Sequence, residues 1–177
     1  MTKVGTRRSA LGKLVLVLAL VAPAPAHAGQ TAPEFAFEDI NPNSATFGDK
    51  LALSARYAER GLVLNFLASW CSYCFKELPE LEQLNTAGVA PVLGVAADEY
   101  DGPGRLREML GQLKLSFPVL LVPEEQIASM GESYGHRILP ATYLIDKTGA
   151  VRSVFEGAVT GRDLTREIQR TLRPARD

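Results

Sequence analysis

The 177-residue chain predicts an α/β fold with a mixed central sheet flanked by helices. The middle of the chain alternates buried, strand-like apolar runs with amphipathic helical patterns, which is typical of parallel strands joined by crossover helices. Near the C-terminus, two further strand-like runs flank Lys147-Thr148-Gly149 and predict an antiparallel hairpin. Parallel units followed by a hairpin give a sheet of mixed direction with helices on both faces.

The first 28 residues have the three parts of a secretory signal peptide. The basic residues of its front are Lys3, Arg7, Arg8 and Lys13. Residues 14–22 are apolar and too few to cross a bilayer, which needs about 20, and Ala26-His27-Ala28 is a small-x-small cleavage site. We expect a signal peptide over 1–28, cleaved near Ala28, and a soluble, periplasmic or otherwise exported domain over 29–177. The choice between the general and the twin-arginine export route is left open.

Residues 29–177 carry 15 basic and 20 acidic side chains, which gives a net charge of about −5. A surface with this balance makes nucleic acid an unfavourable partner. Nothing in the sequence requires a dimer, so we expect a monomer. Export would place the two cysteines of the chain, Cys71 and Cys74, in an oxidising compartment.

The N-terminal part of the exported domain predicts a strand pair and a short helix. Residues 32–39 alternate apolar and polar side chains, as a half-buried strand does, and a turn follows over residues 41–44. Residues 50–53 are a candidate partner strand. Residues 54–60 predict a helix that Gly61 ends, because glycine adopts the left-handed conformation at low cost.

The central strand and the helix after it contain the cysteines. Residues 62–67 form an apolar, strand-like run, and a helical apolar pattern follows. The residues at helical spacing are Glu77, Leu78, Leu81 and Leu84. Pro79 falls inside this helix and is expected to bend it rather than end it, since the apolar pattern continues. Cys71 therefore lies where a helix begins.

The rest of the chain predicts two further strands with their helices, then the hairpin and a last helix. The ranges are strand 89–97, helix 106–113, strand 117–122, helix 124–134 ended by Gly135, hairpin strands 141–146 and 151–155, and helix 160–172. Thr160 and Asp163 match a capping box at the start of the last helix.

The stretch Cys71-Ser72-Tyr73-Cys74 has the spacing of a redox-active dithiol. The unpaired amides and the macrodipole at a helix start favour an anion by up to about 2 kcal/mol, which is roughly 1.5 pKa units. We therefore expect Cys71 to form the attacking thiolate. Cys74, one turn later, is placed to resolve the mixed disulfide.

Two other interpretations of the pair are a structural disulfide and half of a zinc site. A loop of four residues stabilises a fold by only about 2 kcal/mol, against about 4.7 for a loop of about 100 residues. A zinc site needs further ligands, and residues 29–177 offer no further cysteine and one histidine. We expect redox chemistry with no metal and no cofactor besides the Cys71–Cys74 disulfide.

The motif around the cysteines extends from Asn65-Phe66 through Trp70-Cys71-x-x-Cys74-x-x-Glu77-x-Pro79, and Leu139-Pro140-Ala141-Thr142-Tyr143-Leu144-Ile145-Asp146 follows near the end. Together these segments resemble the exported thioredoxin-like proteins of the TlpA/ResA type. The resemblance runs from Ala32 to the C-terminal helix and includes an inserted segment, 97–117, between central strands. It implies a thioredoxin-like fold with an N-terminal strand extension and a central insert, and a thiol-disulfide exchange activity.

The resemblance also implies roles for single residues. It implies a cis peptide bond at Pro140, which serves as the platform for an extended substrate segment beside the dithiol. Cys71 is implied as nucleophile, Cys74 as resolving thiol and Glu77 as the carboxylate that tunes them. Independently, Glu77 lies three residues after Cys74 on one helix face, where a carboxylate raises a thiol pKa or accepts its proton. The alternative for Glu77 is a surface glutamate near a helix start.

Other side chains near the motifs have less defined roles. Trp70, Tyr73 and Leu139 are candidates for the substrate groove. Family members commonly have proline at the position of Tyr73, and because the residues between the cysteines help to set thiolate stability, the direction of electron flow is left open. Asn65 cannot titrate and is either a hydrogen-bonded core amide or part of the site. His136 is interpreted as a loop residue rather than a metal ligand.

The first functional hypothesis is an exported reductase that exchanges its dithiol with cysteine pairs of client proteins. A membrane thiol electron carrier would reduce it again, and cytochrome c maturation is the commonest setting in the family. A protein-disulfide oxidase or isomerase is the alternative. A peroxidase would want threonine or serine where Ala68 stands. A Cu(I) carrier could hold copper between two thiolates, but carriers that resemble this fold space their cysteines by three residues and add a histidine.

Overall fold

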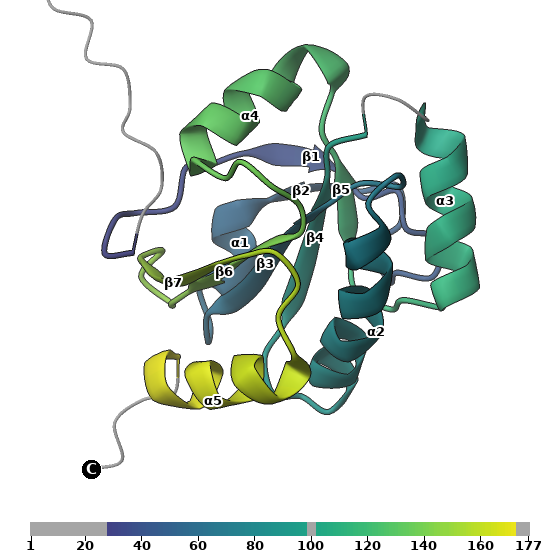
Figure 1. The fold of residues 1–177 in the computed structure, drawn as a ribbon. Helices are drawn as coiled ribbons and strands as arrows, with labels where there is room; N and C mark the ends of the chain where they lie inside the picture. The colour runs from purple at the N-terminus through teal and green to yellow at the C-terminus, as the bar shows by residue number, and fades with distance from the viewer. Residues whose placement is uncertain (1–27, 99–101, 173–177) are drawn as a thin grey trace, which may run out of the picture.

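A computed structural model describes residues 28–98 and 102–172. The expected signal peptide, apart from Ala28, lies outside these residues. The sheet contains five strands in the order β5-β4-β3-β6-β7 (Figure 1). The strands are β3 (Leu62–Leu67), β4 (Val92–Ala96), β5 (Val119–Leu121), β6 (Ala141–Ile145) and β7 (Val151–Glu156). The first three are parallel, whereas β6 is antiparallel to β3 and β7 to β6, which confirms the predicted mixed sheet.

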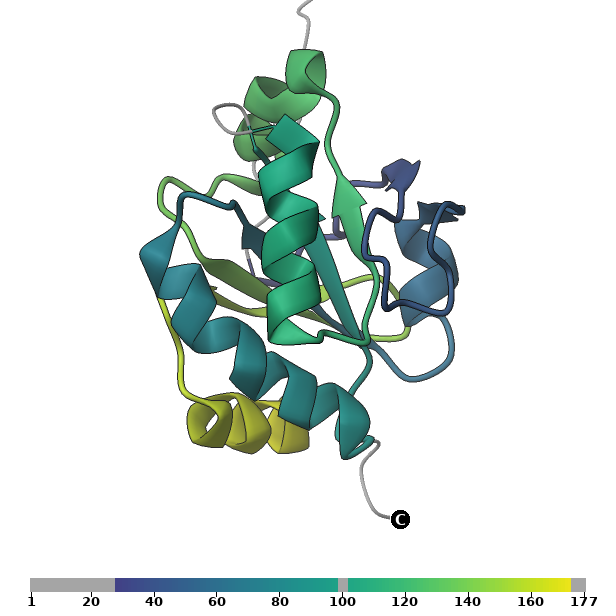
Figure 2. The same ribbon diagram turned by 90° about the vertical axis from the view of Figure 1, so that its right-hand side faces the viewer.

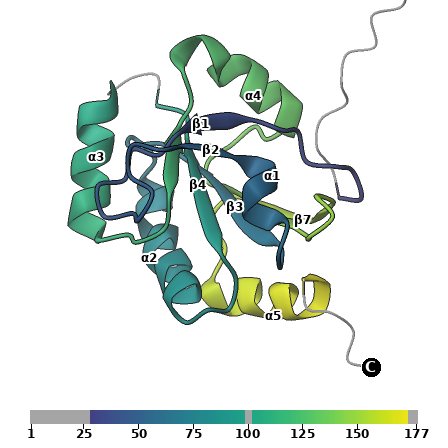
Figure 3. The same ribbon diagram turned by 180° about the vertical axis from the view of Figure 1, so that it is seen from behind.

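Helices cover both faces of the sheet. Successive side chains of β3 point to opposite sides, and all of them are buried, so both faces need a covering layer. Val63 and Leu67 belong to one apolar cluster, and Leu64 and Phe66 to another. The helices over the first cluster are α2 (Ser72–Thr86), α3 (Gly102–Leu113) and α5 (Gly161–Thr171). Those over the second are α1 (Leu53–Tyr57) and α4 (Ile127–Tyr134), which follows a short 3₁₀ turn, Glu124–Gln126. Figure 2 shows α2 and α3 over one face, and Figure 3 shows α1 and α4 over the other.

The N-terminal arm, defined here as residues 29–41, connects the two edges of the sheet. At its start it is hydrogen-bonded to Val151, the first residue of β7. At its end it satisfies both outward backbone groups of Val119 in β5. The Val119 N–H donates to Asp39 Oδ1 (3.0 Å), and the Val119 carbonyl accepts from the Ile40 N–H (2.9 Å).

Between these contacts, β1 (Ala36–Glu38) pairs antiparallel with β2 (Lys50–Ala52) in a separate two-stranded sheet. This is the predicted pairing, but β1 is shorter than the predicted strand over 32–39. At Asp39 the backbone forms a bridge with Leu120 of β5 instead, and the Asp39 carboxylate accepts from the Val119 N–H and from the Thr46 hydroxyl (2.8 Å). The N-terminal extension is therefore held by a side chain as well as by strand pairing.

The inserted segment 97–117 contains α3 and leads into β5, which it places at the edge of the sheet. Three apolar residues of α3 are buried: Leu106, Met109 and Leu110. Asn41 holds the segment after α3, because its Nδ2 donates to Leu115 O (2.8 Å) and Phe117 O (2.7 Å). The insert thus joins the same core as α2.

Several element ends follow the predicted signals. Gly135 caps α4 in a left-handed conformation with φ of 72°. Gly61 is also left-handed (φ 82°), but α1 ends at Tyr57, earlier than the predicted end at Arg60. Thr160 caps α5, since its hydroxyl accepts from the Asp163 N–H (3.2 Å), and α2 continues through Pro79. In the part of the chain that the structure describes, no helix has the length and apolar character needed to cross a membrane.

Candidate active site

The two cysteines lie at the start of α2 and form a disulfide, with Cα atoms 5.3 Å apart. Cys71 is the N-cap residue. Its Sγ accepts a hydrogen bond from the Cys74 N–H (3.1 Å), as capping side chains do. After reduction, the same N–H and the helix macrodipole favour a thiolate on Cys71. The geometry at this position agrees with the expected attacking sulfur.

The two cysteines differ in accessibility. Cys71 is 5% exposed, whereas Cys74 is 0% exposed and lies among the apolar side chains under α2. Both are buried, but only Cys71 retains surface that an incoming disulfide could contact. This difference supports the assignment of Cys71 as nucleophile and Cys74 as resolving thiol.

The loop before β6 lies at the same end of the sheet as the dithiol. Because β6 is antiparallel to β3, its start lies beside the end of β3, which leads into Cys71. The Leu139–Pro140 peptide bond is cis, as the resemblance implies, and Pro140 is buried. Leu139 and Trp70, the chain neighbours of Pro140 and Cys71, line one pocket. The structure thus brings the cis-proline loop and the dithiol together.

The pocket between Trp70 and Leu139 has a volume of about 180 Å³ and is mainly apolar. Its other lining residues are Phe66, Ala97, Ile127, Met130, Gly131 and His136. His136 is a loop residue, as interpreted from the sequence, and its ring centroid lies 4.4 Å from that of Phe66. Burial lowers the pKa of His136, so at neutral pH it presents an uncharged imidazole to the pocket.

Exposed apolar side chains gather near the site. The described residues include five exposed large apolar side chains, and four of them neighbour the dithiol or the cis-proline in sequence: Trp70, Tyr73, Phe75 and Ile138. The Tyr73 ring also lies 5.3 Å from Lys76 Nζ. Grouped apolar exposure of this kind marks an interaction surface. Phe75 was given no role from the sequence. The available signal was an aromatic residue at a position of α2 outside the apolar spacing, where a polar residue is expected.

Glu77 is 2% exposed and lies on the same buried side of α2 as Cys74. Its Oε1 accepts a hydrogen bond from the Thr142 hydroxyl (2.9 Å), and Thr142 Oγ1 accepts one from Asn65 Nδ2 (2.8 Å). Burial raises the pKa of Glu77 to about 7, although the Thr142 hydrogen bond acts in the opposite direction. The alternative of a surface glutamate is therefore wrong, and Glu77 changes charge near neutral pH.

Sequence reasoning missed two polar residues near the site. Thr142 faces Asn65 in the register between β6 and β3, so its place can be found only when that register is known. Asp98 follows β4 and accepts a hydrogen bond from the Ser69 N–H (3.2 Å), just before the dithiol. A carboxylate directly after a buried strand was the available signal for Asp98.

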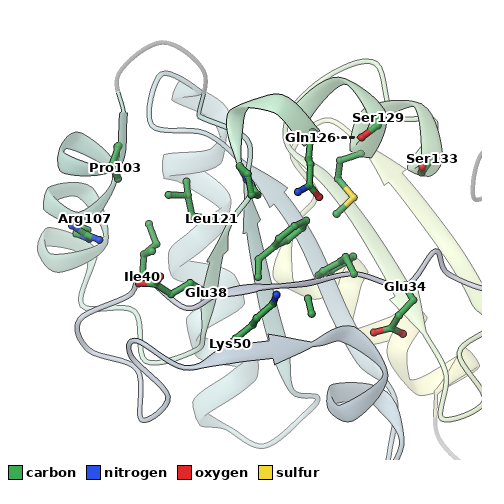
Figure 4. Close-up of a pocket in the computed structure, with 15 residues that line it drawn as sticks. Glu34, Glu38, Ile40, Lys50, Pro103, Arg107, Leu121, Gln126, Ser129 and Ser133 are labelled. Atoms are coloured by element: carbon green, nitrogen blue, oxygen red, sulfur yellow. Dashed lines mark hydrogen bonds between the residues drawn. The ribbon is translucent and has the colours of Figure 1, made fainter.

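A second hollow, of about 790 Å³, lies among β1, α3 and α4 (Figure 4). Its charged lining residues are Glu34, Glu38, Lys50 and Arg107. It shares one lining residue, Met130, with the pocket between Trp70 and Leu139, and neither cysteine lines it. Across residues 28–98 and 102–172, no group of three or more His, Cys, Asp or Glu side chains is arranged to hold a metal ion.

The N-cap cysteine, its fully buried partner and the cis-proline loop suit one chemistry, and the chain is a thiol-disulfide oxidoreductase with a thioredoxin-like fold. A sequence profile of the AhpC/TSA family matches residues 28–154. The chain belongs to this family. Position 68, where a peroxidase would carry a hydroxyl, is the buried Ala68.

Comparisons with individual proteins agree with the resemblance to TlpA/ResA-type proteins. The chain is 27% identical over 142 residues to the thiol-disulfide oxidoreductase ResA of Geobacillus thermodenitrificans, covering 80% of this chain and 76% of the relative. It is 31% identical over 140 residues to ResA of Bacillus anthracis, covering 77% and 73%. The crystal structure of a thiol:disulfide interchange protein DsbE from Chlorobium tepidum superposes with a TM-score of 0.70 and 25% identity, covering 84% of this chain and 99% of that one.

Proposed function

We propose that the protein is an exported reductase of oxidised cysteine pairs in client proteins. The observation that carries this proposal is Glu77, a carboxylate buried on the same side of α2 as the buried Cys74. An ionised carboxylate near a thiol raises the pKa of that thiol. Strong oxidants of this class are oxidising because their reduced form is stabilised. Glu77 opposes that stabilisation, so it favours electron donation by the dithiol.

The proposed reaction has two exchange steps. The Cys71 thiolate attacks one sulfur of the client disulfide, the other client sulfur leaves as a thiolate, and a Cys71–client disulfide remains. Glu77 then accepts the Cys74 proton, and the Cys74 thiolate attacks Cys71 Sγ. The Cys71–Cys74 bond forms while the bond to the client breaks, so the client leaves reduced. A base inside the protein is required because Cys74 is 0% exposed.

The client segment, in this proposal, lies extended along Pro140. The exposed rings of Trp70 and Tyr73, together with Leu139, form the apolar walls of its groove. A pocket of about 180 Å³ beside Trp70 accommodates one apolar side chain near the reacting cysteine. Shape and apolar contact therefore supply the affinity, whereas the dithiol supplies the chemistry.

The proposed location is the periplasm or an equivalent exported compartment. This rests on the signal-like sequence over 1–28, with 29–177 as the exported domain that acts as a monomer. A reductase in an oxidising compartment needs an electron supply, so we infer a membrane thiol carrier as donor. Cytochrome c maturation is the proposed setting, because haem attaches there to reduced cysteines.

Trapping with Cys74→Ser tests the proposal. The variant stops after the first step, so clients accumulate as mixed disulfides that mass spectrometry can identify; the matched variant Cys71→Ser should trap none. Equilibration in redox buffers then gives the direction of electron flow. A reduction potential below roughly −230 mV supports the reductase, whereas one near about −120 mV, as in strong oxidants, would assign the protein as an oxidase.

A further inference from the structure

The hydrogen bonds around Glu77 have a fixed direction. Asn65 Nδ2 donates to Thr142 Oγ1, and the single hydroxyl hydrogen of Thr142 is then directed to Glu77 Oε1. The Asn65 amide can be placed in two orientations. With Nδ2 toward Thr142, the Thr142 hydroxyl hydrogen is free to be donated to an ionised Glu77 carboxylate. Asn65 and Thr142 are 1% and 0% exposed, so water does not compete for these groups.

The two oxygens of Glu77 therefore differ. Oε1 accepts the Thr142 hydrogen bond, whereas Oε2 is buried and has no hydrogen bond of ordinary geometry among the described residues; the Val159 backbone and the Asn65 amide act on the carboxylate more weakly than Thr142 does. A buried acceptor without a donor is costly. When Glu77 is protonated, the proton favours Oε2, because Oε1 already accepts a hydrogen bond from Thr142. Protonation of Oε2 removes the cost of a buried, unpaired charged oxygen.

Among the described residues, none of the side chains that face Glu77 carries a positive charge that would stabilise its carboxylate. Glu80, on the same helix, is the charged group that acts on it, and its carboxylate is bonded to Gly161 N–H at the start of α5. β3 and β6 present Asn65 and Thr142. The loop before α5 presents the backbone of Val159. Of the groups that lower the pKa of Glu77, the Thr142 hydroxyl acts most strongly, ahead of the Val159 backbone and the Asn65 amide.

We propose that Thr142, held by Asn65, is a positioning residue that orients Glu77 so that Oε2 accepts the proton of the Cys74 thiol. The inference rests on the proposed role of Glu77 in the second exchange step. In that step the Cys74 S–H bond breaks and the Glu77 Oε2–H bond forms. The resulting thiolate forms the S–S bond to Cys71, and the electron pair of the Cys71–client bond leaves with the client sulfur, which is thereby reduced.

The test compares Thr142→Val, which removes the hydroxyl and keeps the shape, with Thr142→Ser, which keeps it. Carboxyl NMR of ¹³C-labelled glutamate in the oxidised protein measures the pKa of Glu77 directly. Loss of a hydrogen bond to a charged group should raise this pKa from about 7 to roughly 8 in Thr142→Val, and leave it near wild type in Thr142→Ser. The pH midpoint of the resolution rate, measured on a preformed mixed disulfide, should move in parallel, with about five-fold slower release at pH 7.

Thr142→Ala is the second hydroxyl-free variant, for use should valine disturb folding, which circular dichroism checks. An unchanged Glu77 pKa in the folded hydroxyl-free variants, or an equal change in Thr142→Ser, overturns the positioning role of Thr142. A different result would overturn the proposed function of Glu77: the Glu77 pKa rises in Thr142→Val, but the pH midpoint of the resolution rate does not move, and Glu77→Gln leaves that rate unchanged. The two failures are therefore distinguishable.

Discussion

Replacement of Glu77 by glutamine should make the oxidised protein more stable at neutral pH. Glutamine keeps the size and the acceptor oxygen that faces Thr142, but it never ionises. In wild type, burial raises the pKa of Glu77 from 4.5 to about 7. The unfolded chain therefore ionises this group more readily than the folded protein does, which favours unfolding as the pH rises.

The sign and size follow from the two pKa values. The stabilising effect of the protonated form is complete below about pH 4.5 and is lost as the pH rises to about 7. A pKa difference of about 2.5, at about 1.4 kcal/mol per unit, gives a full effect of about 3.5 kcal/mol. Between pH 5 and pH 8, wild type should lose about 2.5 kcal/mol of unfolding free energy that Glu77→Gln retains.

Urea unfolding of both proteins at half-unit steps from pH 5 to pH 8, with the disulfide intact, measures this difference. His136 acts in the opposite direction, because its lowered pKa makes the folded state lose stability as the pH falls below about 6.5. It is common to both proteins, so subtraction removes its effect and isolates Glu77. A difference between the proteins that stays constant over this range would refute the account of Glu77 as a buried, uncompensated carboxylate.

Three further predictions concern separate parts of the molecule. In the reduced protein, Cys71 should react with iodoacetamide at least about ten-fold faster than Cys74, since only Cys71 combines the N-cap position with solvent contact. Peptide mass spectrometry measures both alkylation rates, and equal rates would contradict the assignment of Cys71 as nucleophile. Asn41→Ala should cost about 2 to 3 kcal/mol in urea unfolding, because two carbonyls after α3 lose their donor. Gly94→Ala should cost about 1 to 3 kcal/mol, because the added Cβ would lie 3.0 Å from a methyl group of Val119; wild-type stability would show that β5 yields easily.

The sequence could predict the elements whose signals are local. Apolar runs predicted strands of the central sheet, and helical patterns predicted the helices. Gly135 and Thr160 marked helix ends where the structure has them, whereas α1 ends at Tyr57, before the predicted end at Arg60. The dithiol at a helix start could also be predicted, because a strand-like run leads directly into Cys71. The cis bond at Pro140 was implied by the resemblance, since local sequence contains no physical signal for it.

Features that depend on contacts between distant residues were out of reach. The burial of Glu77 follows from its position three residues after Cys74 on the apolar side of α2, but charge alone suggested the surface. The hydrogen bonds from Asn65 through Thr142 require the register between β3 and β6, which alternation does not fix. The end of β1 at Glu38 coincides with the change of partner at Asp39, whose backbone bridges Leu120 and whose carboxylate bonds Val119, 80 residues away.

The bond between Asp39 and Val119 also bears on self-association. An uncovered edge strand is a template on which a second copy can add its own strand. The N-terminal arm occupies that template at β5 and precedes it by about 80 residues in the chain, so the arm is already present when β5 is synthesised. A chain shortened beyond Asn41 would leave this edge bare, and domain-swapped or aggregated forms are the expected product.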